Sequence, residues 1–394
     1  MRERTVLIAG GGLGGLATAA CLLTQGIDVE VYEQAPQLGE VGAGIQVSAN
    51  ATRVFRHLGL LDAMDAVAAR PDVYQFRVFD TGEILQSIPL GQSYVERHGV
   101  PYFSIHRADI LNILVDKVRS LKADAIHLNA KAVGYEENAD GVTLLLEGGR
   151  QVRGDALIGA DGIRSAIRAQ LLGQTPANYT GDIAWRAVVE KSVLPEEYQT
   201  NAVDIWVGPA RHAVTYPLRR GTLTNFVGSV EDDSWKDDSW TVKRPWEEMQ
   251  RDFIGWHGMI QALIDAADRD SCYRWALNNR LPVENWSSSH TVLMGDAAHP
   301  TLPYMAQGAA MAFEDAAVLA RAFTAESAVS DAITLFQRNR IARTTRIVTE
   351  SSANRKLFHM PSMEEMKASF SQRNMNAERN AWLFSYDPLA VELV

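Results

Sequence analysis

Three glycines near the amino terminus, Gly10, Gly12 and Gly15, follow the short apolar run Thr5–Ala9. This run predicts a buried parallel strand, and the largely apolar stretch Leu16–Gln25 after the glycines predicts a helix. In a unit of this kind the glycines allow a tight turn, close approach of a pyrophosphate to the backbone, and close packing of helix on strand. The free N–H groups at the helix start favour phosphate. The feature therefore predicts a dinucleotide-binding fold.

A second strand is predicted over Asp28–Tyr32, directly before Glu33. A carboxylate at this position can accept hydrogen bonds from the ribose hydroxyls of an adenosine, and it disfavours a 2′-phosphate there. No charged residue occurs in the stretch from Thr5 to Ile27. The glycines in this stretch, with no cleavage site after it, favour a buried strand and helix over a signal or membrane segment. We expect a cytoplasmic protein with no membrane association.

Bulk composition excludes several function classes. The chain has 394 residues, enough for two closely associated domains, and a net charge of −10 without a basic stripe, so nucleic acid is not an expected partner. Its two cysteines, Cys21 and Cys272, have no metal or redox spacing, which suits a reducing compartment. No His-x-Glu or Cys-x-x-Cys pattern indicates a metal site.

Two later motifs distinguish between NAD and FAD. Gly159–Gly162 (GADG) follows a predicted strand, and Val292–Asp296 (VLMGD) is an apolar strand that ends in an aspartate. A plain NAD dehydrogenase has no need of a second carboxylate so far downstream. Asp296, followed by a helix from about Gly308, suits a ribityl chain and a flavin edge resting on a helix start. The sequence therefore predicts bound FAD.

The remaining segments alternate apolar and polar residues. Val73–Phe79 and Glu83–Ile88 flank Asp80–Gly82, which indicates a hairpin. Further short antiparallel strands are predicted at Ile183–Val189, Ala202–Val207, His212–Pro217 and Leu223–Val230. We predict a discontinuous FAD-binding domain (1–72, 98–178 and 284–325) interrupted by a sheet-rich substrate domain (73–97 and 179–283).

Residues 326–394 are predicted to form a helical carboxyl-terminal region. The helix expected over Ala332–Ser351 is basic and polar. We expect its arginines to lie on a solvated or subunit-facing surface; they are Arg338, Arg340, Arg343 and Arg346.

The chain resembles the single-component FAD-dependent aromatic hydroxylases, which include p-hydroxybenzoate, salicylate, 3-hydroxybenzoate 6- and 6-hydroxynicotinate 3-hydroxylases. The matching segments are Ala9–Gly15, Glu40–Gly44, His106–Arg107, Gly159–Ser165, His212–Pro217 and Met294–Ala312. The resemblance implies an α/β fold with a Rossmann-type FAD domain interleaved with an antiparallel-sheet domain. It also implies a cycle in which NAD(P)H reduces FAD, O2 adds at flavin C4a as a hydroperoxide, and the distal oxygen passes to an electron-rich ring.

The resemblance also implies cofactor roles. Gly10, Gly12 and Gly15 would hold the pyrophosphate, Glu33 the ribose and Asp296 the ribityl chain. Arg107 would reach the phosphate or ribityl portion, and Asp161 with Arg168 would lie where FAD and the visiting nicotinamide nucleotide meet. Pro300, Gly308 and Ala309 would line the flavin ring. The other expected cofactor contacts are Leu13, Gln34 and Gly44.

Substrate contacts are predicted partly from strand geometry. His212 and Tyr216 lie four residues apart on one predicted strand, so they share a face. The resemblance places both in the substrate pocket, where we expect His212 to accept the phenol proton or anchor it and Tyr216 to orient the ring. Further pocket residues expected are Gln46, Tyr102, Pro303 and Tyr304.

Several functions remain open at this stage. The run Leu302–Met311 most resembles salicylate hydroxylases, for which hydroxylation at the carboxyl-bearing carbon would release CO2 and leave catechol. Tyr304, Pro303 and Gln46 differ from the residues of the 6-hydroxynicotinate or 3-hydroxybenzoate enzymes, although both substrate types remain alternatives. Others are an epoxidase or tailoring monooxygenase acting on a larger natural product, and an NAD-binding dehydrogenase or sensor. A homodimer is left open.

Overall fold

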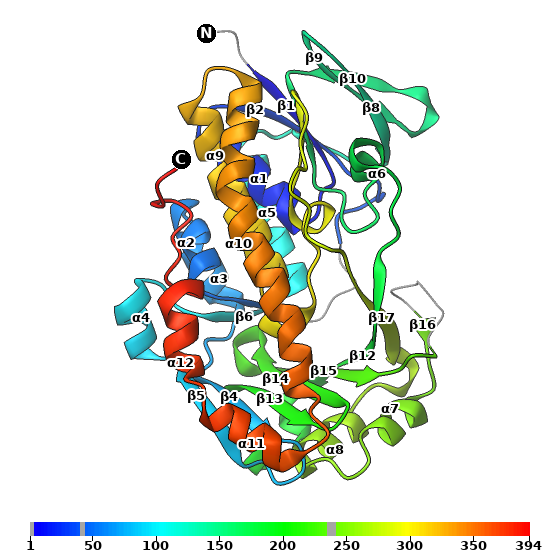
Figure 1. Cartoon of the computed structure of the whole chain (residues 1–394), viewed down its shortest axis with the longest axis vertical. Coiled ribbons are helices and arrows are strands. Elements are labelled where there is room, and N and C mark those ends of the chain that lie inside the picture. Colours follow the sequence, from blue (N-terminus) through cyan, green and yellow to red (C-terminus); the bar gives the residue numbers. More distant parts are fainter. Residues whose placement is uncertain (1–3, 40–43, 235–241) are drawn as a thin grey trace.

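The computed structural model describes residues 4–39, 44–234 and 242–394. A five-stranded parallel sheet forms one end of the molecule, in the order β18-β11-β1-β2-β7 (Figure 1). Its strands are β1 (Thr5–Ala9), β2 (Asp28–Tyr32), β7 (Ile126–His127), β11 (Ala156–Gly159) and β18 (Thr291–Leu293). The buried aliphatic side chains of β1 and β11 explain their central place, since a parallel sheet is covered on both faces.

Helix α1 (Leu13–Thr24) packs against both α5 (Arg107–Leu121) and α9 (Gly308–Ala325). The uncharged stretch from Thr5 to Ile27 is therefore a buried strand and helix, as expected. None of the described helices is both long and apolar enough to cross a bilayer. Two small antiparallel sheets complete this part, formed by β8 (Ala132–Asn138), β9 (Gly141–Leu146) and β10 (Gln151–Gly154), and by β3 (Gly44–Val47) with β6 (Phe103–His106). Short helices lie beside them: α2 (Ala49–His57), α3 (Leu61–Val67), α4 (Gln92–His98) and α6 (Ala166–Leu172).

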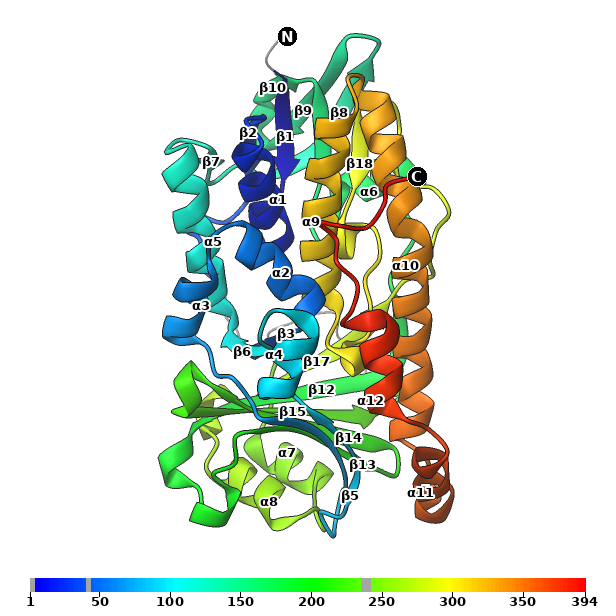
Figure 2. The ribbon, with the colours of Figure 1, turned by 90° about the vertical axis from the view of Figure 1, so that its left-hand side faces the viewer.

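An eight-stranded sheet forms the opposite end, in the order β16-β17-β12-β15-β14-β13-β4-β5 (Figure 2). Its strands are β4 (Val73–Val78), β5 (Ile84–Pro89), β12 (Asn178–Glu190), β13 (Ala202–Gly208), β14 (Arg211–Leu218), β15 (Leu223–Glu231), β16 (Val242–Lys243) and β17 (Tyr273–Asn279). All its pairs are antiparallel except β13 with β4. The hairpin predicted around Asp80–Gly82 thus joins strands from much later in the chain.

The two faces of this sheet bury different sets of side chains. On β12, Ile183 and Trp185 pack on the face covered by α7 (Trp246–Asp252) and α8 (Gly258–Asp265). Ala184 and Val188 point to the other face, where the segment Leu302–Met305 packs. Strict alternation along the strand therefore separates a structural face from a face directed at the parallel-sheet half.

The carboxyl-terminal helices connect the two halves. Helix α10 (Val329–Phe358) runs along most of the molecule, and α11 (Met363–Ser371) and α12 (Met375–Glu378) follow it beside the large sheet (Figure 2). A short π-helical turn, Arg379–Leu383, follows α12.

The expectation of a solvated arginine surface on α10 is wrong for two of its four arginines. Arg340 is completely buried, where it binds Glu314 (2.8 Å) and Asp315 (2.7 Å) of α9, and Arg343 binds Glu314 (2.6 Å). The acidic pair on the neighbouring helix supplies the charge that makes this burial tolerable. Arg338 and Arg346 are exposed, as expected.

Candidate active site

The glycine turn after β1 is held by packing as well as by conformation. Gly10 has φ +109°, and a Cβ there would lie 2.4 Å from the Ala160 carbonyl oxygen. A Cβ on Gly15 would lie 2.0 Å from the Gly10 oxygen. A Cβ on Gly12, in contrast, would meet no atom within 4 Å. Gly10 and Gly15 thus bring strand and helix together, whereas Gly12 leaves open space at the start of α1, where Leu13 is the first helical residue.

Glu33 lies at the carboxyl end of β2, against this turn. Its carboxylate accepts hydrogen bonds from the backbone N–H of Gly11 (2.7 Å) and of Ala35 (2.8 Å). These bonds fix its position and leave lone pairs for further donors, since an ionised carboxylate offers about four acceptor sites. Gln34 beside it is exposed.

Asp161 follows β11 and caps the start of α6. Its Oδ2 accepts from the N–H of Ala166 (2.8 Å) and Ile167 (3.3 Å). Oδ1 is buried and makes no hydrogen bond within the described part of the chain, and burial raises the pKa of this carboxyl. An acceptor in this state fits a site that a polar ligand completes.

Arg168 fastens the turn after β18 to α6. Its Nη1 donates to the carbonyl oxygens of Ala297 (2.8 Å) and Ala298 (3.0 Å), and the side chain is almost fully buried. Arg168 thereby holds two of the three predicted cofactor segments together. Direct contact between Arg168 and a cofactor remains a prediction.

Asp296 lies on that turn, immediately after β18. Its side chain is exposed to solvent, yet desolvation by surrounding protein raises its pKa, while the charges of Arg107 and His299 oppose the rise. Access to solvent combined with desolvation describes a group inside a recess rather than on a convex surface. Arg107, the first residue of α5, is exposed, and Pro300 is buried.

These observations fit an FAD. β1, β2, β11 and β18 all end at the same edge of the sheet, the edge at which open α/β sheets bind ligands. Three features lie along this edge: the open space at Gly12, the unpaired Asp161 Oδ1 and the recessed Asp296. Gly308 and Ala309, at the start of α9, are half-buried beside it.

On the sheet side, His212 and Tyr216 share one face of β14, as predicted. The Tyr216 hydroxyl donates to the Gly44 carbonyl oxygen (2.6 Å), while the Gly44 N–H donates to Asn225 Oδ1 (3.0 Å). A Cβ on Gly44 would lie 2.4 Å from the Tyr216 ring. Of the motif Glu40–Gly44, only Gly44 lies within the described residues, and it is clamped to this sheet.

His212 is buried next to Tyr304, with ring centroids 4.8 Å apart. Its Nδ1 lies 2.7 Å from His359 Nε2. Burial, reinforced by His359, holds the pKa of His212 well below its usual value, so the ring is neutral at neutral pH. The Tyr304 hydroxyl donates to Asp182 and lies 3.3 Å from Ser229 Oγ.

Gln46 and Tyr102 form a second polar pair. The Tyr102 hydroxyl donates to Gln46 Oε1 (2.6 Å), and both side chains are buried. Burial raises the pKa of Tyr102 well above its usual value, so the phenol remains a donor. Tyr102, Tyr216 and Tyr304 belong to one hydrophobic cluster, whereas Pro303 is exposed. The structure thus brings Tyr102, Tyr216 and Tyr304 into one cluster, and His212 contacts this cluster through Tyr304.

A family model described as "FAD binding domain" matches residues 3–351. The chain belongs to this family. The 3-hydroxybenzoate 6-hydroxylase of Polaromonas naphthalenivorans (strain CJ2) is 38% identical over 97% of this chain and 96% of that protein. The 6-hydroxynicotinate 3-monooxygenase of Pseudomonas fluorescens is 35% identical over 99% of this chain and 96% of that protein. The solved salicylate hydroxylase substrate complex superposes with a TM-score of 0.83 at 26% identity, over 100% of this chain and 99% of that chain.

The protein is therefore an FAD-dependent aromatic monooxygenase, and the predicted fold class and cofactor are confirmed. The alternative of an NAD dehydrogenase or sensor is set aside by this membership. The domain boundaries and the roles of single residues remain predictions.

Sequence reasoning missed several polar residues of this monooxygenase. Arg186 shares a row with Val227 and Val214, and so lies on the same sheet face as His212 and Tyr216. Its guanidinium carbon lies 4.5 Å from the centre of the Trp275 ring. The sequence did offer a signal for Arg186, because a charged residue there interrupts an otherwise apolar strand at a position that faces inward. The other missed residues are Asp182, Glu231, Arg355 and His359, for which the sequence offers no local pattern.

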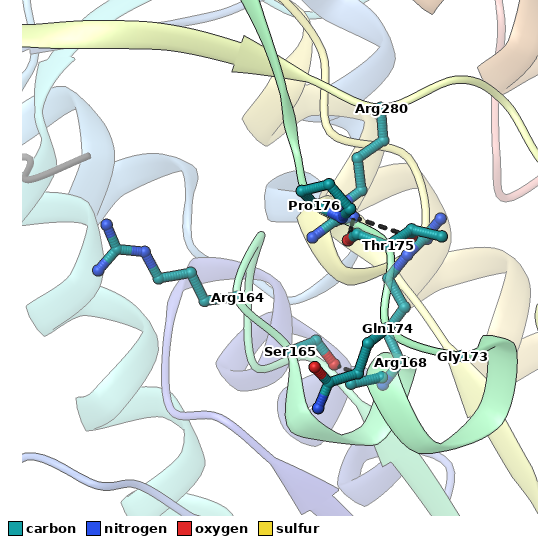
Figure 3. A pocket seen from close by; sticks show the side chains of 9 residues that line it. Arg164, Ser165, Arg168, Gly173, Gln174, Thr175, Pro176 and Arg280 are labelled. Carbon is teal, nitrogen blue, oxygen red and sulfur yellow. Dashed lines mark hydrogen bonds between the residues drawn. The ribbon is translucent and has the colours of Figure 1, made fainter. Parts of the chain in front are cut away.

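A cavity of about 300 Å³ opens beside α6, on the side of Arg168 (Figure 3). Arginines 164, 168 and 280 line it, together with the loop Gly173–Pro176. Arg280 reaches across this loop, since it donates from Nη2 to the Ile163 carbonyl oxygen (3.0 Å) and from Nη1 to Thr175. The concentration of guanidinium groups gives the cavity a positive character.

Proposed function

We propose that this enzyme uses NAD(P)H and O2 to hydroxylate a small aromatic acid that already carries a ring hydroxyl, of the salicylate, 3-hydroxybenzoate or hydroxypyridine-carboxylate type. The observation that carries the proposal is His212, a buried neutral histidine on the sheet face that meets the flavin-motif segment. Bound FAD would supply the chemistry of oxygen activation. The chain's own residues would bind the ring, handle its proton and exclude water.

A ring hydroxyl directs the reaction because its phenolate form is far more electron-rich than the phenol. His212 Nε2 makes no hydrogen bond among the described residues, whereas Nδ1 is held by His359. A neutral imidazole in this state can accept the hydroxyl proton. The neighbouring hydroxyls of Tyr216 and Tyr304 are directed to Gly44 and Asp182, so we assign them to shaping the pocket and orienting the ring.

We assign Arg186 to bind the acid group of the substrate. The positive charge of Arg186 lowers the pKa of Tyr216, although burial has the larger, opposite effect. Stacking on Trp275 restricts the guanidinium, which favours a directed contact with a carboxylate. An aromatic ring placed between His212 and Arg186 would then present its hydroxyl and its carboxylate to opposite ends of the pocket.

The arginine-lined cavity beside α6 supports a transient site for the phosphates of NAD(P)H. Arg168 joins this cavity to the turn that carries Asp296, so a nucleotide there would lie next to the cofactor edge. The proposal includes both NADH and NADPH as the reductant.

The homodimer also stays a prediction, and sedimentation of the purified protein would test it.

A substrate panel tests the proposal. The flavin-loaded enzyme is mixed with NADH or NADPH and each of several hydroxybenzoates and hydroxypyridine carboxylates, while NAD(P)H and O2 consumption, H2O2 and product mass are recorded. We expect one compound to stimulate oxidation and gain one oxygen atom, with loss of CO2 if salicylate is the substrate. Stimulation by a larger natural product alone would favour the epoxidase or tailoring alternative.

Replacement of His212 tests its role directly. We expect His212→Ala to retain FAD and to lose hydroxylation by about 100-fold or more, the usual contribution of a positioned base. The exposed His57, at the end of α2, provides the control His57→Ala. An undiminished hydroxylation rate in flavin-loaded His212→Ala refutes the assignment.

A further inference from the structure

A continuous chain of hydrogen bonds leads from His212 to the surface of the protein. His212 Nδ1 lies 2.7 Å from His359 Nε2, and His359 Nδ1 lies 3.0 Å from Glu231 Oε1. The side chain of His359 is 2% exposed, whereas that of Glu231 is 36% exposed. The three residues come from β14, the residue after α10 and the end of β15, so the chain exists only in the folded protein.

The carboxylate at the outer end sets the direction in which the hydrogen bonds of this series are donated. An ionised Glu231 can only accept, so His359 donates its Nδ1–H to it and keeps a lone pair on Nε2. That lone pair accepts from His212 Nδ1–H. His212 is therefore left with its lone pair on Nε2, the form that a proton acceptor needs.

We propose that His359 and Glu231 form a proton relay that carries the ring-hydroxyl proton of the substrate from His212 to solvent. The inference rests on the proposed function. The substrate O–H bond breaks as its proton binds His212 Nε2. The proton on His212 Nδ1 moves to His359 Nε2, and the proton on His359 Nδ1 moves to Glu231, which releases it to water. Each residue gains and loses one proton, and the substrate keeps the electron pair as a phenolate.

The surrounding charges oppose storage of a proton on either histidine. Burial lowers the pKa of His359 to about 3, with help from the positive charges of Arg355 and Arg211. Burial also raises the pKa of Glu231, an effect that Asp182 and Asp233 reinforce and Arg355 opposes. A neutral pair of histidines beside a carboxyl with raised pKa suits passage of the proton outward rather than its retention.

The same residues could be taken for a metal site. Among the described residues, Asp182, Glu231 and His359 bring three ligand atoms within 4.8 Å of one another. Arg355 already supplies a cation to this cluster, since it binds Asp182 (2.6 Å) and reaches Glu231 (3.3 Å). The ion pairs explain the acidic grouping, and the histidine's second nitrogen is committed to His212.

Proton release upon binding tests the relay. Flavin-loaded enzyme is mixed rapidly with a nitro-substituted hydroxybenzoate at a pH at which the free probe is protonated. Absorbance reports formation of the bound phenolate, and a pH indicator reports the proton that reaches solvent. Glu231→Gln is the main variant because an amide still accepts the His359 N–H but cannot take up its proton. His359→Gln removes the middle of the chain. Glu83→Gln is the control, because it removes an exposed carboxylate that pairs with Lys367 and takes no part in the relay.

We expect Glu231→Gln to slow phenolate formation and proton release together by about 10-fold or more. Added imidazole or acetate should restore the rate, because Glu231 lies at the surface. Glu83→Gln should match the parent enzyme. If the parent forms phenolate and Glu231→Gln does so equally fast without added base, the relay is overturned while the proposed function stands. If the parent binds the probe without ionising it, both the base and the relay are overturned, and the substrate panel decides the function separately.

Discussion

His299 and Asp315 form a buried pair, with Nε2 of the histidine 2.6 Å from Oδ2 of the aspartate. The same Oδ2 accepts the Gly295 N–H (3.0 Å), and Oδ1 binds Arg340 (2.7 Å). The turn that carries Asp296 is therefore anchored by Asp315 to helix α9, and through Arg340 to helix α10. His299 acts through this anchor.

Asp315→Asn should destabilise the protein and loosen its hold on FAD. Interactions with His299 and Arg340 outweigh burial and keep the pKa of Asp315 far below its ordinary value, so the group is ionised at neutral pH. Its loss leaves buried Arg340 only partly paired. We expect a loss of about 3 kcal/mol in the free energy of unfolding, measured by denaturant titration. Glu350→Gln, which removes an exposed partner of Arg346, should change stability by about 0.5 kcal/mol or less. Equal effects of the two variants would contradict the anchoring role.

Two glycines of the first turn should respond differently to alanine. Gly15→Ala places a methyl group 2.0 Å from a backbone oxygen, so it should destabilise the apoprotein. Gly12→Ala meets no protein atom and should leave the melting temperature of the apoprotein nearly unchanged, yet lower its affinity for FAD where the pyrophosphate approaches the backbone. Thermal unfolding and flavin content of both variants provide the measurement. Normal FAD affinity in Gly12→Ala would place the pyrophosphate elsewhere.

Arg186 should set the affinity for the aromatic acid. Arg186→Met should raise the KM of the preferred substrate by roughly 10- to 100-fold, the equivalent of a charge-assisted hydrogen bond. Arg186→Lys should recover part of the loss, because it restores the charge without the planar fork. A phenol that lacks the carboxylate serves as the internal control, and its KM should be nearly the same in all three proteins. A parallel loss for both ligands would indicate general damage to the pocket.

Stability should fall as the pH drops below the ordinary histidine pKa. Burial lowers the pKa of both His212 and His359 in the folded protein, that of His359 to about 3, so the unfolded chain binds more protons below pH 6.5. The contribution of His359 is therefore complete above pH 6.5 and is lost progressively toward pH 3, by about 1.4 kcal/mol per pH unit, and that of His212 changes in the same direction. Denaturant titrations from pH 7 to 4.5 should show that the free energy of unfolding falls less steeply with pH in His359→Gln than in the parent protein. An identical slope would mean that His359 is not neutral in the folded protein.

Local sequence determined the first strand-helix-strand unit of the cofactor half. The glycine turn, the strand before it and Glu33 lie within one βαβ unit, where short-range packing decides the geometry. Alternation along β14 likewise placed His212 and Tyr216 on one face, as the structure shows. These features follow from backbone periodicity, which the order of residues states directly.

Tertiary structure alone decided what lies opposite those side chains. Arg340 appeared to be a surface charge because its partners, Glu314 and Asp315, lie on another helix. His212 meets His359 across 147 residues of sequence, and no local pattern announces that contact. The protonation state of a buried group depends on such distant neighbours, because desolvation and charge act through space rather than along the chain. The sequence by itself therefore determined the fold and the cofactor, while the route open to a proton depended on how the distant segments pack.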